Sequence, residues 1–446
     1  MILYISSSKD NTIENNTLSQ SYNRGMFNQT WIMVESGSTS NSVARSLYDF
    51  DFTSYNSKLT NNVFQNSQVG YGQFNLYTLP VTSSVSIVDE TLQFNPLTTA
   101  WIEGSSSVGG GKNKASNWLS SSELVGWNCA GATADTASVP SDYITTTKIF
   151  DDIRLTLSSS WLLNLSTSVY TGLMVRYTDT EESGSSDYWK TFYGRTTFNK
   201  LKQPAIYVYV DDDIQDDRNN VIVNTTSDLY FYNYNNNNSL ENVTGGVTCS
   251  IYGYATSGSS GSILVSSSIA TSSLTGIYYV SLVLTGTYSS ASIYDLWKNS
   301  SGTLLGGFTS SIYAQSGKDN YYDPYMPYSY RTFTNIPDEL DFNDIRTVRV
   351  YNYKTLNNFS RTGSLQETIA FNEIYYNVID LETGYVFYDF STYTRLSRDK
   401  NGNYFKFCFD ALPYNREYQF KYKIVENNMN IIVNGPKFRT VYNEIF

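Results

Sequence analysis

Alternation of apolar and polar side chains along short segments is the feature that most restricts how this chain can fold. Consecutive side chains of a β-strand point to opposite faces, so alternation predicts a strand with one buried face. No long stretch has a helical period or a heptad repeat. The sequence therefore predicts an all-β protein with less than about 10% helix. The clearest examples are "IYVYV" (206–210), "IYYVSLVL" (277–284), "YFKFCFD" (404–410) and "EYQFKYKI" (417–424).

Two breaks in composition divide the chain into segments. "DDDIQDD" (211–217) is strongly acidic, and residues 317–337 are rich in tyrosine and proline. We predict β-sandwich domains over residues 41–211, 212–320 and 337–446, with a Tyr/Pro linker over residues 321–336. Residues 1–40 are predicted to hold an N-terminal arm and the first strand. Because residues 6–30 are polar and rich in asparagine, we expect the arm to become ordered against a partner.

The residue types that are missing exclude several classes of function. The chain has 446 residues and no histidine, so it contains no Ser-His-Asp site, no Cys-His site and no histidine-bound metal. Its net charge of −11 and its lack of a basic block do not suit nucleic-acid binding. We also expect no membrane-spanning segment and no secretory signal, since neither a long apolar run nor a basic leader is found.

The number and spacing of the cysteines do not indicate a disulfide framework. Cys129, Cys249 and Cys408 are odd in number and fall in different predicted domains. Such isolated residues behave as small hydrophobic side chains in a protein that folds in a reducing cytoplasm. We therefore expect three thiols and no disulfide bond.

An ordered set of motifs in the first domain carries a resemblance to a known family. The motifs are "ARSLYDFDF" (44–52), "YGQFNLYTLP" (71–80), the Trp101-Ile102-Glu103-Gly104 turn, "FDDIRLTLSSSW" (150–161) and the closing "PAIYVYV" (204–210). Their order resembles the β-sandwich domain named for its DNRLRE motif, a jelly roll similar to carbohydrate-binding modules. The signature position reads "YGRTTFN" (193–199) here, which departs from that motif.

The second and third domains carry resemblances of their own. "TGIYYVSLVLTGTYSSASIYDLW" (275–297) is similar to an immunoglobulin-type sandwich. Residues 375–407 and "LPYNREYQFKYKI" (412–424) resemble C-terminal, immunoglobulin-like β-domains of tailed-bacteriophage neck and tail proteins. These motifs belong to the framework of the fold and name no active site.

The resemblances imply a structural protein with no enzymatic activity. The expected role is a component of a tailed-phage virion, in the neck, collar or tail, made in the host cytoplasm. Its partners would be further copies of itself and other virion proteins in a symmetric assembly, with the arm or the linker contacting another chain. The alternative is a carbohydrate-binding or adhesion module that contacts host glycans. A glycan-cleaving enzyme is a third reading.

Acidic residues provide two candidate sites. Asp211, Asp213, Asp216 and Asp217 could bind calcium between two domains, since hard cations prefer clustered carboxylate oxygens. The alternative is a solvated, self-repelling linker, and no other cofactor is expected. A second set, Asp89, Glu90 and Glu103, could supply the carboxylate pair of a glycosidase, or could be surface charge at strand ends.

Aromatic residues provide the remaining candidates. Trp118 lies in a loop rich in glycine and serine and is the candidate for stacking on a glycan, whereas Trp101 and Trp161 are expected in the core. The linker tyrosines are candidate interface residues because tyrosine is enriched at protein interfaces. Their alternative role is packing on a neighbouring domain of the same chain. These interface candidates are Tyr321, Tyr322, Tyr325, Tyr328 and Tyr330.

Overall fold

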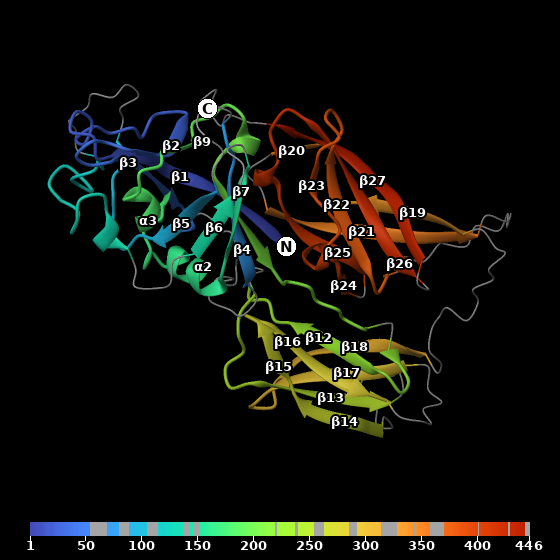
Figure 1. The fold of residues 1–446 in the computed structure, drawn as a ribbon. Helices are drawn as coiled ribbons and strands as arrows, with labels where there is room; N and C mark the ends of the chain where they lie inside the picture. Colours follow the sequence, from blue (N-terminus) through green and yellow to red (C-terminus); the bar gives the residue numbers. More distant parts are fainter. Residues whose placement is uncertain are drawn as a thin grey trace. The chain divides into compact units, whose positions relative to one another are not determined.

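The prediction of an all-β protein is confirmed by the computed structural model (Figure 1). Of the described residues, 55% lie in strands and 7% in helices. No helix among them is long and apolar enough to cross a lipid bilayer. The structure describes residues 1–53, 69–79, 89–104, 115–136, 142–146, 151–218, 221–236, 240–253, 263–284, 292–313, 328–341, 345–356, 370–399, 401–426 and 429–441.

The chain divides into two compact units, Ile2–Asp211 and Asp212–Phe446, with Met1 grouped with the second. The first unit has ten described strands in one connected sheet, ordered β6-β5-β8-β3-β1-β10-β4-β7, with β2 pairing with β3 and β9. Their bounds are β1 Ile2–Glu14, β2 Gln29–Glu35, β3 Ser42–Phe50, β4 Val69–Leu76, β5 Glu90–Pro96, β6 Asp142–Thr146, β7 Ile153–Leu157, β8 Leu173–Tyr177, β9 Tyr188–Tyr193 and β10 Ala205–Val210.

Strand β1 joins the part of the sheet that contains β10, β4 and β7 to the part that contains β3, β8, β5 and β6. Its first residues, 2–6, pair with β10, and residues 7–14 pair with β3 after a bulge near Ser7. A strand that changes partners in this way makes a corner between packed sheets. The short helices are α2 (Ser159–Ser166), whose N-cap is Ser158, and α3 (Asp179–Glu182).

The structure corrects the prediction of an arm over residues 6–30. Residues up to Glu14 belong to β1, and Asn11 and Thr12 are buried. Their polar atoms are satisfied inside the domain, because Asn11 Nδ2 donates to Ser116 O at 2.8 Å and Thr12 Oγ1 accepts from Trp31 N at 3.1 Å. Polar composition therefore did not mean disorder here.

The second unit begins with a sandwich of a five-stranded sheet, β11-β18-β17-β13-β14, and a three-stranded sheet, β12-β16-β15. Trp297 and Phe231 stack in its core with 5.4 Å between ring centroids. The strands are β11 Val221–Ile222, β12 Thr226–Tyr232, β13 Val247–Gly253, β14 Ile263–Ile269, β15 Thr271–Leu274, β16 Ile277–Val283, β17 Ser292–Asn299 and β18 Leu304–Tyr313.

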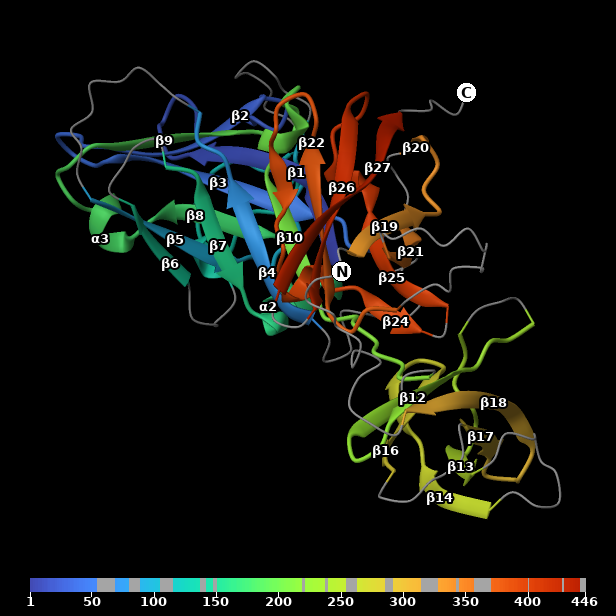
Figure 2. The ribbon, with the colours of Figure 1, turned by 90° about the vertical axis from the view of Figure 1, so that its right-hand side faces the viewer.

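The last part of the chain has a four-stranded sheet, β19-β21-β25-β24, and a five-stranded sheet, β20-β27-β26-β22-β23. Figure 2 shows β22, β26 and β27 side by side. The alternating aromatics meet in the core, where Tyr376 stacks on Phe405 at 4.3 Å. The strands are β19 Tyr328–Thr334, β20 Glu339–Asp341, β21 Ile345–Leu356, β22 Ile374–Asp380, β23 Val386–Tyr388, β24 Ser397–Asp399, β25 Gly402–Cys408, β26 Glu417–Glu426 and β27 Met429–Val441.

The predicted linker over residues 321–336 is also corrected in part. Residues 328–334 form β19, which pairs with β21 from Tyr328 to Thr334. Tyr328 and Tyr330 are therefore strand residues of the last domain. Tyr321, Tyr322 and Tyr325 lie outside the described residues.

Candidate functional site

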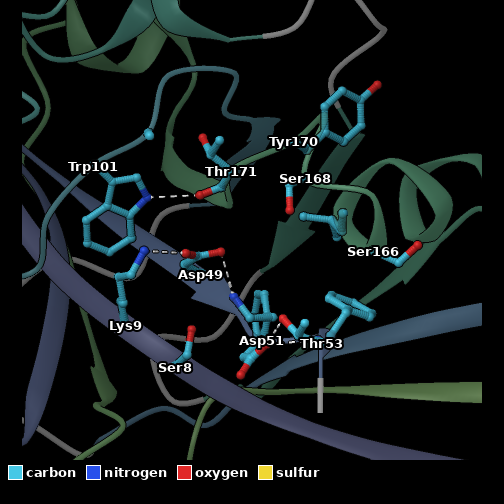
Figure 3. A pocket seen from close by; sticks show the side chains of 14 residues that line it. Ser8, Lys9, Asp49, Asp51, Thr53, Trp101, Ser166, Ser168, Tyr170 and Thr171 are labelled. Atoms are coloured by element: carbon cyan, nitrogen blue, oxygen red, sulfur yellow. Dashed lines mark hydrogen bonds and ion pairs between the residues drawn. The ribbon is translucent and has the colours of Figure 1, made fainter. Parts of the chain in front are cut away.

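A cavity of about 390 Å³ opens in the first unit, where β1 and β3 lie near the segment that follows α2 (Figure 3). Lys9 comes from β1 and Asp49 from β3, two strands that pair with each other. Trp101 comes from the turn after β5, and Tyr170 follows α2. The cavity therefore gathers side chains from four separate parts of the sequence.

The charged side chains of the cavity are held in fixed positions. Lys9 Nζ lies 2.7 Å from Asp49 Oδ2 and 5.5 Å from the centroid of the Trp101 ring. The Trp101 indole is itself anchored, because Nε1 donates to Thr171 O at 3.2 Å. Asp51 Oδ1 accepts from the backbone N–H of Thr53 at 2.8 Å and from its hydroxyl at 2.5 Å. These contacts prepare the site before a ligand enters.

The chemistry of this cavity is that of a hydrogen-bonding site. Carboxylates accept, an ammonium donates, and hydroxyl groups do both. Trp101 and Tyr170 are only 3% and 5% exposed, so they form walls and do not offer an open stacking surface. The hydroxyls come from Ser8, Thr53, Ser166, Ser168 and Thr171.

A partly buried ionic network connects strand β1 with two of the motifs found in the sequence. Arg195, in the "YGRTTFN" segment, holds the carboxylate of Glu103 through Nε and through Nη2, the latter at 2.5 Å. Glu103 Oε1 also accepts from Asp10 N at 2.8 Å, and Asp10 Oδ2 accepts from Arg195 N at 2.6 Å. The network ties β1 to the turn after β5 and to the segment after β9.

Burial raises the pKa of Asp10 to about 7, and the nearby negative charge of Glu103 adds to the rise. The backbone hydrogen bond from Arg195 and its guanidinium charge act in the opposite direction. Asp10 thus lies in a crowded, buried environment beside a carboxylate that is already paired, and it binds a proton more strongly than an ordinary aspartate. We assign this network a role in holding the domain together.

Three loops meet beside this network. The first loop, residues 15–28, is tied to the second, residues 115–131, by Trp118 N donating to Gln20 O at 3.1 Å. It is tied to the third, residues 194–199, by Gly194 N donating to Asn28 O at 2.8 Å.

Each of these loops exposes a large apolar side chain. Leu18 is 80% exposed, Leu124 is 91% exposed and Phe198 is fully exposed. We call these three side chains the loop-tip residues. Each is an exposed apolar side chain on a loop that is hydrogen-bonded to a neighbouring loop, and exposed apolar groups that gather in one patch mark an interaction surface.

The structure does not bring the predicted calcium ligands together. Asp213 pairs with Arg395 at 3.0 Å and Asp216 with Arg218 at 3.1 Å, while Asp217 forms an ion pair with Arg398. Among the described residues, which include all of Asp211 to Asp217, no group of three acidic or cysteine side chains is placed to hold a metal. Asp213 and Asp217 are thus neutralised by arginines that lie far away in the sequence, and Asp216 by the nearby Arg218.

The acidic residues predicted as a glycosidase carboxylate pair, Asp89, Glu90 and Glu103, likewise have different surroundings. Glu103 belongs to the network with Arg195, whereas Glu90 is buried, accepts from Tyr177 OH at 3.3 Å and lies 4.0 Å from Lys190 Nζ. Burial raises the pKa of Glu90. Asp89 is an exposed residue before β5. These contacts give the acidic side chains structural partners.

Tryptophan positions agree only in part with expectation. Trp101 and Trp161 are buried, as predicted. Trp118 is not an open platform, because the Arg45 guanidinium covers its ring at 4.7 Å and the indole packs on the cluster that contains Trp127. The sequence reading missed Lys9, Asp49 and Asp51, although the "DFD" of the "ARSLYDFDF" motif was a usable signal.

The cysteines form no disulfide bond with one another, as expected. Cys249 and Cys408 are buried, which agrees with a role as small apolar side chains, but Cys129 is exposed. Burial raises the pKa of the Cys249 thiol well above its ordinary value.

Comparisons with known proteins leave the family open. No family model matches the sequence, and no curated protein matches it significantly. Among solved structures, a mutant of Salmonella alpha-2-macroglobulin aligns over 99% of this chain and 26% of its own length, at 8% identity and a TM-score of 0.18. Escherichia coli alpha-2-macroglobulin activated by porcine elastase aligns over 99% and 44%, at 8% identity and a TM-score of 0.17. The chain spans less than half of each, and such low scores carry no argument.

Proposed function

We propose that this protein is a structural component of a tailed-phage particle, in its neck, collar or tail. It acts through protein–protein interfaces and turns over no substrate. The observation that carries the proposal is the set of loop-tip residues, Leu18, Leu124 and Phe198, on three loops that are tied together by hydrogen bonds. The resemblance of the third domain to β-domains of phage neck and tail proteins suggests that the assembly is a phage particle.

The energy available from the loop-tip residues suits such an interface. Full burial of one leucine or phenylalanine contributes about 1.5–3 kcal/mol. Three side chains on one copy would therefore contribute roughly 5–9 kcal/mol before the costs of association. Because the loops are tied to one another by backbone hydrogen bonds, docking orders less backbone than it would for unconnected loops, and the remaining cost is the ordering of the exposed side chains. Rotational symmetry would repeat the contact in every copy.

The test replaces Leu18, Leu124 and Phe198 together by aspartate. The matched control replaces Val169, which is 56% exposed in the same domain but outside these loops, by aspartate. Tagged copies are expressed in cells infected by the phage that carries this gene, and particles are purified. We expect the control to enter particles and the triple variant to be depleted at least tenfold. Equal incorporation of both would contradict the proposal, as would absence of the unaltered protein from particles.

A second candidate function is glycan binding by the cavity of Figure 3. The specific observation in its favour is the prearranged set of Lys9, Asp49 and Asp51 among hydroxyl groups. Sugar hydroxyls both donate and accept, so they match carboxylates and an ammonium at hydrogen-bond distance. A particle protein that also adheres to a surface would use both sites.

Glycan arrays test this second function. The variants Asp51→Asn and Lys9→Met should lower the signal of any bound glycan at least fivefold, whereas Asp187→Asn, outside the cavity, should not. A glycan signal that all three variants retain would place binding elsewhere. No signal on a broad array would remove the second function and leave the first untouched.

A further inference from the structure

A second cavity, also of about 390 Å³, lies within the unit Asp212–Phe446. Its floor is apolar, because Ile214 and Ile277 are buried together against Tyr230, Tyr232 and Leu240. The volume falls within the range of about 300–1,000 Å³ that is usual for small-molecule sites. Among the residues predicted from the sequence as calcium ligands, Asp216 lines this cavity, but no small-molecule site was predicted here.

The walls of this cavity are fixed by the acidic segment that starts the unit. Ile214 O accepts from Arg398 N at 2.8 Å, and Asp216 N donates to Arg398 O at 3.0 Å, so the segment pairs with β24. On its other side, Asp217 N donates to Asp228 O of β12 at 2.8 Å. One short segment is thus bound to both domains of this unit, and the cavity is formed without a ligand.

Most charges around the cavity have an ionic partner. Arg349 binds Asp399 through two hydrogen bonds of 3.0 and 2.7 Å. Asp212 forms an ion pair with the amino group of Met1.

Arg218 completes this set of paired charges. It lies between two buried carboxylates, 3.1 Å from Asp216 and 2.9 Å from Asp295. Its guanidinium also lies 4.5 Å from the centroid of the Phe308 ring, which lines the cavity.

Lys406 is the exception among these charged groups. It lines the cavity from β25, on the opposite face of the strand from the buried rings of Phe405 and Phe407. Within the described ranges, no carboxylate forms an ion pair with it. A partly buried ammonium beside an apolar floor favours an anion that also brings apolar surface.

We propose that this cavity binds an aromatic group that carries a carboxylate. The ring would lie on the floor between Ile277 and the tyrosines, where offset or edge contacts with other rings are favourable. The carboxylate would meet Lys406, with the nearby hydroxyls of Tyr232 and Tyr404, 3.3 Å apart, as further donors. This site is independent of the loop-tip residues and of the proposed role in a particle.

The test uses three probes with the full-length protein: N-acetylphenylalanine, its uncharged amide and N-acetylglycine. Affinities come from ligand-observed nuclear magnetic resonance titrations at pH 7. We expect the acid to bind at least fivefold more tightly than the amide, and N-acetylglycine not to saturate. Absence of binding by the acid would overturn the proposal, and so would equal binding by N-acetylglycine.

Variants test separately how the cavity recognises the carboxylate and how it recognises the aromatic ring. Lys406→Gln should remove the preference for the acid over the amide, whereas Lys421→Gln, a lysine of strand β26 in the same domain, should keep it. Tyr234→Ala, which removes an exposed ring at the cavity, should weaken acid and amide equally and preserve their ratio. A preference for the acid that survives Lys406→Gln in a protein with an unchanged circular dichroism spectrum would contradict the assignment.

Discussion

Asp10 makes the stability of the first unit depend on pH, and Asp10→Asn should remove that dependence. The folded pKa of Asp10 is raised from 3.8 to about 7, chiefly by burial. A carboxyl group whose pKa is raised on folding binds a proton more strongly in the folded state. Its stabilising contribution is therefore complete below its unfolded pKa and is lost as the pH rises through about 7.

The two pKa values set the size of the effect. A shift of roughly 3 units corresponds to a ceiling of about 4 kcal/mol. Linkage places about 2.5 kcal/mol of that loss between pH 5 and pH 8. Asparagine mimics the protonated side chain and keeps an oxygen that accepts from Arg195 N. The free energy of unfolding of Asp10→Asn should then change less over this range than that of the unaltered protein, by about 2.5 kcal/mol.

Urea unfolding at pH 5 and pH 8, followed by tryptophan fluorescence, measures this difference. Every tryptophan except Trp297 lies within residues 2–211, so the signal reports mainly on the first unit. Asp187→Asn is the control, because hydrogen bonds from Ser36 lower the pKa of this exposed carboxyl group. A group with a lowered pKa does not cause stability to fall as the pH rises, so this substitution should leave the pH profile of the unfolding free energy unchanged. Identical pH profiles for Asp10→Asn and the unaltered protein would refute the reasoning.

Three further predictions concern both units. Arg218→Ala leaves the buried Asp216 and Asp295 without their cation and should destabilise the second unit by about 3–5 kcal/mol, measured as lost hydrogen-exchange protection in residues 221–313. Unchanged protection there would mean that the aspartates find another partner. Ellman's reagent should modify Cys129 in the native protein, and Cys249 and Cys408 only in denaturant, so a second fast thiol would contradict the burial described. Gly172→Ala should lower the melting temperature of the first unit, because the residue has φ +136° and an added Cβ would lie 2.3 Å from Tyr48 O, whereas Gly184→Ala should have a small effect.

Local patterns explain what the sequence could predict. Period-two alternation depends only on neighbouring residues, so "YFKFCFD" and "EYQFKYKI" could be assigned to strands β25 and β26. A change of composition at Asp211 coincides with the division between the two units. Buried tryptophans beside apolar runs, such as Trp161, followed from the same reasoning.

Long-range pairing explains what the sequence could not predict. The polar residues 6–14 belong to a strand, where Asn11 donates a hydrogen bond to Ser116 O, 105 residues away in the sequence. The acidic segment is neutralised by Arg395 and Arg398, which only the fold brings near. The same holds for the two cavities. Lys9 and Trp101 line the first cavity, and Ile214 and Lys406 line the second, although no sequence motif joins either pair.

The most direct test of the proposed role is a particle reconstruction by electron cryomicroscopy. The account predicts repeated copies of this chain around a rotational axis, with Leu18, Leu124 and Phe198 of each copy buried against another chain. Particles without this protein, or copies whose loop-tip residues face solvent, would contradict the account.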